Sequence, residues 1–147
     1  MNFEIARRAC IAVFLFTVSN VALAQHPATV GDLLDQGGRK LTKVEVSKLI
    51  AGNVMSGPQV NNPTTKFANS YNEDGSFRGN SVGSNRVVNG VWGTWVVDEN
   101  GIMRSTINSS NGARFAGTSV FFSLGSSYFA AQNEDRTSPL SQREFSK

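Results

Sequence analysis

The side chains that could perform nucleophilic or acid–base chemistry are few in this chain of 147 residues. The single histidine, His26, and the single cysteine, Cys10, both lie near the N-terminus, so the rest of the sequence supplies no Ser-His-Asp or Cys-His set. No group of histidines and cysteines could bind a metal. A carboxylate pair, as in glycoside cleavage, remains the open route to catalysis. We predict a protein that is not an enzyme and uses no cofactor or metal.

Acidic and amide side chains gather in two similar stretches, YNEDGSF and VDENGIM. Asp74, Asp98 and Asn100 could offer oxygens to calcium, but an EF-type loop needs ligands at alternate positions, then Gly at six and Glu at twelve. Neither stretch has that spacing. Each instead ends an acid-rich tetrapeptide at a glycine, Gly75 or Gly101, which is typical of a hairpin with a type I turn and a left-handed glycine. We interpret both stretches as hairpin turns.

Both tryptophans, Trp92 and Trp95, lie in the stretch VVNGVWGTWVVDENG. Because side chains alternate between the two faces of a strand, a spacing of three puts the indoles on opposite faces. We predict Trp95 inside the core and Trp92 on the other face, beneath or beside a helix. The alternative is that Trp92 is exposed and binds a partner, with Arg78 and Tyr128 as the other candidate partner-binding residues.

One helix is predicted in the segment LTKVEVSKLIAGN, at about Lys43 to Ala51. Thr42 and Glu45 have the spacing of a capping box, and Leu41 and Val46 that of a hydrophobic staple. The apolar residues of this segment recur at helical spacing, so they form one stripe. We expect the stripe to cover the second face of a β-sheet. The preceding TVGDLLDQGG could add one further helical turn.

Short segments of alternating apolar and polar residues follow Gly52, separated by Gly, Asn and Asp turns, as in antiparallel sheets. Pairing through the two hairpin turns puts Val97 opposite Met103 and Tyr71 opposite Phe77. The predicted fold is mainly β, a single antiparallel meander closing into a small barrel or sandwich of about seven strands, with one short N-terminal α-helix. The predicted strands are Asn53–Ser56, Thr65–Tyr71, Ser76–Val82, Val87–Val97, Ile102–Asn108, Arg114–Ser123 and Ser127–Ala131.

The N-terminus has the pattern of a secretory signal peptide: Arg7 and Arg8, an apolar run, and Ala22-Leu23-Ala24. The apolar run is well short of the roughly 20 residues of a spanning helix. We predict cleavage near Ala24, a periplasmic or secreted location, and no transmembrane helix in the mature chain. The chain then divides into a signal peptide (1–24), a partly flexible N-terminal segment (25–40), a domain of one helix and antiparallel strands (41–132) and a polar C-terminal tail (133–147).

The charge of the predicted mature chain is small. The chain has 14 basic and 11 acidic residues, and removal of Arg7, Arg8 and Glu4 leaves 12 and 10, a net charge of +2. The remaining basic residues are scattered, whereas nucleic-acid binders usually carry a clustered basic patch. We therefore predict no nucleic-acid partner.

The segments LTKVEVSKLIAGN, YNEDGSFRG, GTWVVDENGIM and VFFSLGSSYF together resemble a family of small exported proteobacterial proteins of unknown function. Members often carry one cysteine after the Asp-Gly hairpin and another before the last strands. Met103 and Phe115 stand near those places here, so a disulfide or cysteine-based role is not expected. The resemblance implies a fold rather than a chemistry. The matching residues are Gly52, Asn53, Tyr71, Asp74, Gly75, Gly79, Gly93, Trp95, Val97, Gly101, Val120, Gly125 and Tyr128.

A weaker, local resemblance links NGARFAGTSVFFSLGSSYFA to the C-terminal signature of periplasmic C-type lysozyme inhibitors, which are small β-barrels. That family inserts a serine and a lysine into the lysozyme cleft. Here Asn111 replaces the serine, Leu124 replaces the lysine, and Phe122 stands for a tryptophan.

These patterns favour an exported, non-catalytic periplasmic protein that binds or scaffolds an unknown protein or small ligand of the cell envelope. A lysozyme-inhibitor-like protein is one alternative. A small outer-membrane β-barrel is another, although such barrels need strands of about ten residues with an apolar outer band, and most predicted strands are shorter.

Overall fold

The computed structural model describes residues 26–147. The predicted signal peptide lies outside the described residues, so its cleavage stays a prediction. In residues 26–147 no helix is long and apolar enough to cross a membrane. The elements are α1 (Val30–Asp35), β1 (Arg39–Lys40), α2 (Lys43–Ile50), β2 (Asn53–Pro58), β3 (Lys66–Tyr71), β4 (Ser76–Val82), β5 (Val88–Val97), β6 (Ile102–Ser109), β7 (Arg114–Leu124), β8 (Ser127–Ala131) and β9 (Ser141–Ser146).

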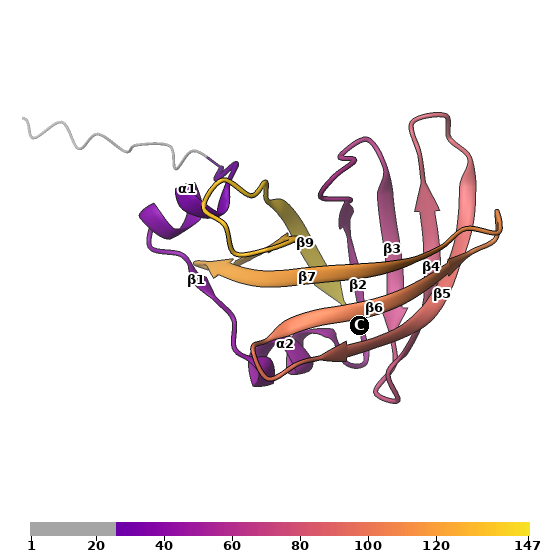
Figure 1. Ribbon diagram of the computed structural model, residues 1–147, viewed down its shortest axis with the longest axis horizontal. Coiled ribbons are helices and arrows are strands. Elements are labelled where there is room, and N and C mark those ends of the chain that lie inside the picture. The colour runs from indigo at the N-terminus through magenta and orange to yellow at the C-terminus, as the bar shows by residue number, and fades with distance from the viewer. Residues whose placement is uncertain (1–25) are drawn as a thin grey trace, which may run out of the picture.

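The strands form one antiparallel sheet that closes on itself. Its order is β1-β7-β6-β5-β4-β3-β2-β9-β8, and β8 also pairs with β7, which closes a barrel of eight strands from β2 to β9 (Figure 1). The two-residue strand β1 is added beside β7. Closure leaves few free edges, which limits association of the sheet with other chains. The prediction of a mainly β antiparallel barrel is confirmed, with eight strands in place of about seven.

The hairpin turns fix the register of the long strands. Gly75 has φ +83° and Gly101 has φ +75°, the left-handed values that glycine adopts without a steric penalty. Tyr71 therefore lies opposite Phe77, and Val97 lies opposite Met103, as predicted. Because side chains alternate along each strand, these pairs all point into the barrel.

Helix α2 closes one end of the barrel. Its capping box is formed, since Glu45 N donates to Thr42 Oγ1 and Thr42 N donates to a Glu45 carboxylate oxygen. Val46 and Ile50 are fully buried in the cluster that also holds inward residues of the strands. The apolar stripe therefore faces the barrel interior, at the bottom of the view in Figure 1.

This placement corrects the expectation for Trp92. The outer face of β5 is not covered by α2: Trp92 is 49% exposed, and Val96 is exposed as well. The helix was expected on the second face of the sheet because a strand apolar on both sides is usually covered on both. In a closed barrel, however, a single short helix can bury its stripe at the end of the lumen, which leaves the outer face of β5 in solvent.

The outer face that is covered belongs to β7 and β8. Helix α1, which also begins with a capping box, buries Val30 and Leu33 against this face. The strand residues of this outer cluster are Val120, Phe122, Phe129 and Ala131. The N-terminal segment expected to be partly flexible thus contributes α1 and β1 to the fold.

The prediction of a loose polar tail over residues 133–147 is wrong. Residues Ser141–Ser146 form β9, which pairs with β2 on one side and β8 on the other. Alternation explains the error: Arg143 and Phe145 point inward while Gln142 and Glu144 are exposed, so a strand that completes the core still has a polar composition.

Candidate functional site

A cavity of about 770 Å³ occupies the half of the barrel away from α2. That volume lies within the usual range of small-molecule sites, roughly 300–1,000 Å³. Its wall combines apolar side chains with amides, hydroxyls and one arginine. The larger apolar residues are Met55, Val60, Phe67, Val91, Met103, Ile107 and Phe115. Polar residues make up more than half of the wall, and those that point inward include Asn69, Tyr71, Ser105, Ser119 and Arg143.

The cavity opens along the edge of β7. Five consecutive residues of this strand, Phe115 to Ser119, line it. Since successive side chains point to opposite faces, a run of consecutive residues can border a cavity only where the cavity reaches the strand edge. In residues 26–147, the segment from Arg114 to Ser119 pairs with β6 alone, because pairing with β8 begins at Val120. This edge gives a ligand a route to the lumen.

Arg143 is the charged residue of the cavity wall. Its side chain is almost fully buried, at 5% exposure, and burial lowers the pKa of Arg143 to about 10. The guanidinium stays protonated at neutral pH because that value is still well above 7. Its Nη1 donates to the carbonyl oxygens of Pro58 at 2.7 Å and Gln142 at 3.0 Å.

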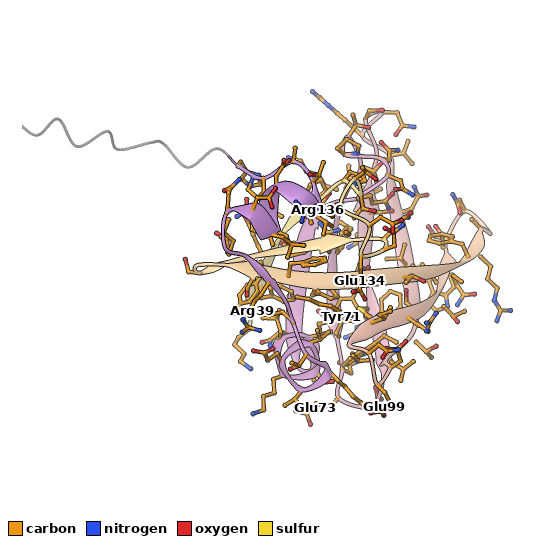
Figure 2. The ribbon with its side chains drawn as sticks, turned by 60° about the vertical axis from the view of Figure 1, so that its left-hand side comes forward. Arg39, Tyr71, Glu73, Glu99, Glu134 and Arg136 are labelled. Atoms are coloured by element: carbon orange, nitrogen blue, oxygen red, sulfur yellow. The ribbon has the colours of Figure 1, made fainter. Side chains whose placement is uncertain are left out.

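Asn69 and Tyr71 supply a neutral polar pair on β3. Asn69 Nδ2 donates to the Tyr71 hydroxyl at 3.4 Å, and Asn69 Oδ1 is buried without a partner in the described chain. Burial raises the pKa of Tyr71 above its ordinary value, so the phenol stays neutral. Figure 2 shows Tyr71 within the barrel, whereas Arg39 and Glu99 lie at its outside.

Tyr71 joins the cavity wall to an aromatic cluster of the core. Tyr71 stacks on Phe77 with ring centroids 5.2 Å apart and meets Trp95 edge-on at 6.0 Å. The Trp95 indole Nε1 donates to the carbonyl oxygens of Asn72 and Ser76, each at 3.2 Å. The prediction that Trp95 points into the core is confirmed, although its side chain is only partly buried.

The predicted partner-binding residues fall into two places. Trp92 and Arg78 are direct cross-strand neighbours on the exposed outer face of β5 and β4. Tyr128 is on β8, partly buried, and packs edge-on against Phe145 in the interior at 5.6 Å. The structure therefore brings Trp92 and Arg78 together and separates Tyr128 from both.

A second cavity, of about 410 Å³, lies beside α2 and includes Tyr128. Two of its charged groups pair with each other, since Arg39 Nη2 lies 2.6 Å from Glu45 Oε1. This pairing lowers the pKa of Glu45 to about 2. Lys48, the third charged residue of its wall, is exposed on α2 rather than buried, so this smaller cavity is a weaker candidate than the lumen.

Sequence reasoning missed Asn69 and Arg143. Asn69 lies between the inward aromatics Phe67 and Tyr71, so alternation alone could have placed it in the lumen. Arg143 could be found only after Ser141–Ser146 was identified as a strand, because its polar neighbours hide the alternation.

The cavity has the size and the polar groups to bind a small molecule, but few of its side chains could perform acid–base or nucleophilic chemistry. In residues 26–147 no cluster of three or more His, Cys, Asp or Glu side chains could hold a metal ion. Comparisons of the chain with protein-family models, curated proteins and solved structures find no match. The resemblances to exported proteobacterial proteins and to lysozyme inhibitors therefore stay predictions.

Proposed function

We propose that this protein is an exported binding protein that holds a small molecule with apolar and polar parts inside its barrel and performs no chemistry on it. The observation that carries the proposal is the cavity of about 770 Å³. Concave sites of this size, lined by apolar groups and a few placed polar groups, are the usual form of small-molecule sites.

The construction of the lumen supports the proposal. At the end near α2 the interior is filled by large side chains, among them Phe121 and Ile50. At the other end several inward positions hold small residues, including Ser105, Gly117 and Ser119. Since well-packed interiors leave few voids larger than a water molecule, space of this size fits a ligand site better than it fits a structural core.

The two alternatives fit the geometry less well. Asn111 lies in the turn before β7 and Leu124 at the far end of that strand, so the two positions that resemble the inhibitory residues are a full strand apart. For an outer-membrane barrel, the lipid-facing surface should be apolar. Here outward positions include Arg78 and Arg104, which are exposed.

Export rests on the sequence pattern before residue 25. If the protein is exported, the N-terminus of the mature chain should be Gln25, because Ala22-Leu23-Ala24 forms the cleavage site. N-terminal sequencing of the exported protein tests this, and a soluble product that retains Met1 would contradict it.

The binding proposal is tested with N-phenyl-1-naphthylamine, a neutral probe whose fluorescence rises in apolar surroundings. The purified chain should bind it saturably. Ser105→Phe, which fills the lumen from an inward position of the cavity wall, should abolish binding. Thr106→Phe is the matched control, because the next residue along β6 points to the opposite face and does not line the cavity.

Unfolding curves of both variants show whether they keep the fold. If Ser105→Phe fails to fold, Ser119→Phe fills the same cavity from β7. Saturable binding that survives both lumen substitutions, or no binding by the native chain, would overturn the proposal.

A further inference from the structure

Arg143 is a buried cation without an anionic partner in residues 26–147. None of the ion pairs of the described chain includes it, although its side chain is only 5% exposed. Burying a charge is unfavourable unless an opposite charge and a full set of hydrogen bonds compensate it. The position is therefore poorly explained by stability alone and is better explained by a ligand.

The hydrogen bonds of Arg143 leave one edge of the guanidinium free. Nη1 donates hydrogen bonds to the carbonyl oxygens of Pro58 and Gln142. Nε has no partner, and Nη2 takes part in neither carbonyl contact. Because Nε–H and Nη2–H lie side by side on one edge, they match the two oxygens of a carboxylate.

Neighbouring residues hold the guanidinium in place. The Arg143 guanidinium carbon lies 5.1 Å from the centre of the Phe67 ring, within the range of a cation–π contact. Gly57 leaves the necessary room: a Cβ atom there would lie 3.1 Å from Arg143 Nη1 and 2.6 Å from the Gln142 carbonyl oxygen. The side chain is thus positioned before any ligand arrives, which lowers the entropy lost on binding.

Asn69 gives a second, independent indication. Its Oδ1 is buried without a partner, while its amide nitrogen faces the Tyr71 hydroxyl. Either orientation of the amide leaves one polar atom of Asn69 free. Asn69 and Arg143 line the same cavity, so two polar groups without partners share one lumen.

We propose that the lumen selects amphipathic carboxylates. The carboxylate of the ligand binds Arg143, and a polar atom of the ligand next to it binds Asn69. The apolar body of the ligand lies against side chains such as Met103 and Ile107. This inference rests on the proposed function, and it adds the charge class of the ligand. The lateral opening at β7 lets an elongated apolar chain enter while its head group stays at the arginine.

The experiment compares dodecanoate with dodecanol, which have the same chain length and differ in charge. Each is titrated as a competitor against N-phenyl-1-naphthylamine bound to the native chain. Dodecanoate should bind about tenfold or more tightly than dodecanol, since hydrogen bonds to charged groups are worth that much. Arg143→Met should remove the preference, measured as the ratio of the dodecanoate and dodecanol affinities in that variant, and Arg143→Lys should restore part of it.

The matched control is Arg78→Met, which removes an exposed arginine from the outer face of β4 and should leave the preference unchanged. If the neutral probe binds but dodecanoate and dodecanol compete equally, or if the preference survives Arg143→Met, the inference fails and the proposed function stands. If neither the probe nor either competitor binds the native chain, both fail. If Arg143→Met does not fold, Arg143→Gln serves in its place.

Discussion

The two halves of the barrel interior are built differently. Near α2, the lumen is filled by large side chains whose polar atoms have partners, as for the Trp95 indole. In the other half, small residues and two polar groups without full partners, Asn69 and Arg143, surround a cavity. Strand β7 runs through both halves, with Phe121 in the filled one and Ser119 at the cavity, so side chains account for part of the difference. Pairing accounts for another part, because β8 pairs with β7 only from Val120 onward.

This contrast indicates a division of labour. The filled half buries apolar area, which is the main favourable contribution to folding. The half with the cavity buries less apolar area and contains a buried charge. This combination is unfavourable for stability and favourable for binding. Substitutions should therefore change stability in one half and ligand affinity in the other.

The largest expected effect separates the two halves on a single strand. Phe121 and Phe115 both point inward from β7, but Phe121 is fully buried near α2 and Phe115 is 46% exposed at the cavity mouth. Phe121→Ala should lower the free energy of unfolding by about 3–5 kcal/mol, the range for truncation of a buried aromatic. Phe115→Ala should change it by about 0.5 kcal/mol or less. Urea unfolding measures both, and equal losses would contradict the division.

A smaller effect concerns the closure of the filled end. Arg39 and the Thr42 amide hold the pKa of Glu45 at about 2, below its ordinary 4.5. A carboxylate whose pKa is lowered by folding stabilises the fold at pH values above its pKa in the unfolded chain. This contribution disappears as the pH falls and the carboxylate binds a proton. The urea concentration at the unfolding midpoint should therefore decrease as the pH is lowered from about 4.5 to about 2.

Glu45→Gln should lower the midpoint at neutral pH and flatten this acid dependence. Glu144→Gln is the control, because Glu144 is exposed on β9 and forms none of the ion pairs of residues 26–147. An unchanged acid dependence in Glu45→Gln would show that the helix end contributes little to closure.

The smallest expected effect is at the outer face. Trp92 is 49% exposed, so Trp92→Ala should change the free energy of unfolding by about 0.5 kcal/mol or less. Acrylamide should quench Trp92 strongly in a Trp95→Phe background and quench Trp95 less in a Trp92→Phe background. Equal quenching would show that the two faces of β5 do not differ as described. A partner-binding role of Trp92 and Arg78 stays a prediction.

Several elements could be predicted because their signals are local. The capping box of Thr42 and Glu45 placed α2 within one residue of its observed end, and β4 and β8 were predicted with their observed bounds. The hairpin glycines also gave the correct register, since a turn of fixed length determines which residues face each other.

The candidate site was less accessible from the sequence. Asn69 carried a usable signal through its position between two inward aromatics. Arg143 carried almost none, because the strand that holds it has only one apolar residue, Phe145. The burial of Arg143 depends on the pairing of β9 with β2. This pairing places Ser146 opposite Val54, two residues that are far apart in the sequence.

The sequence by itself determined the class of the fold, the helix that closes it and the faces of each long strand, because capping, turn chemistry and alternation act over a few residues. Only the tertiary structure decided that β9 completes the barrel, that α2 enters its end rather than covering Trp92, and that Arg143 and Asn69 meet in one cavity. Those outcomes depend on which distant strands pair, and the geometry of a closed barrel requires all of its strands together.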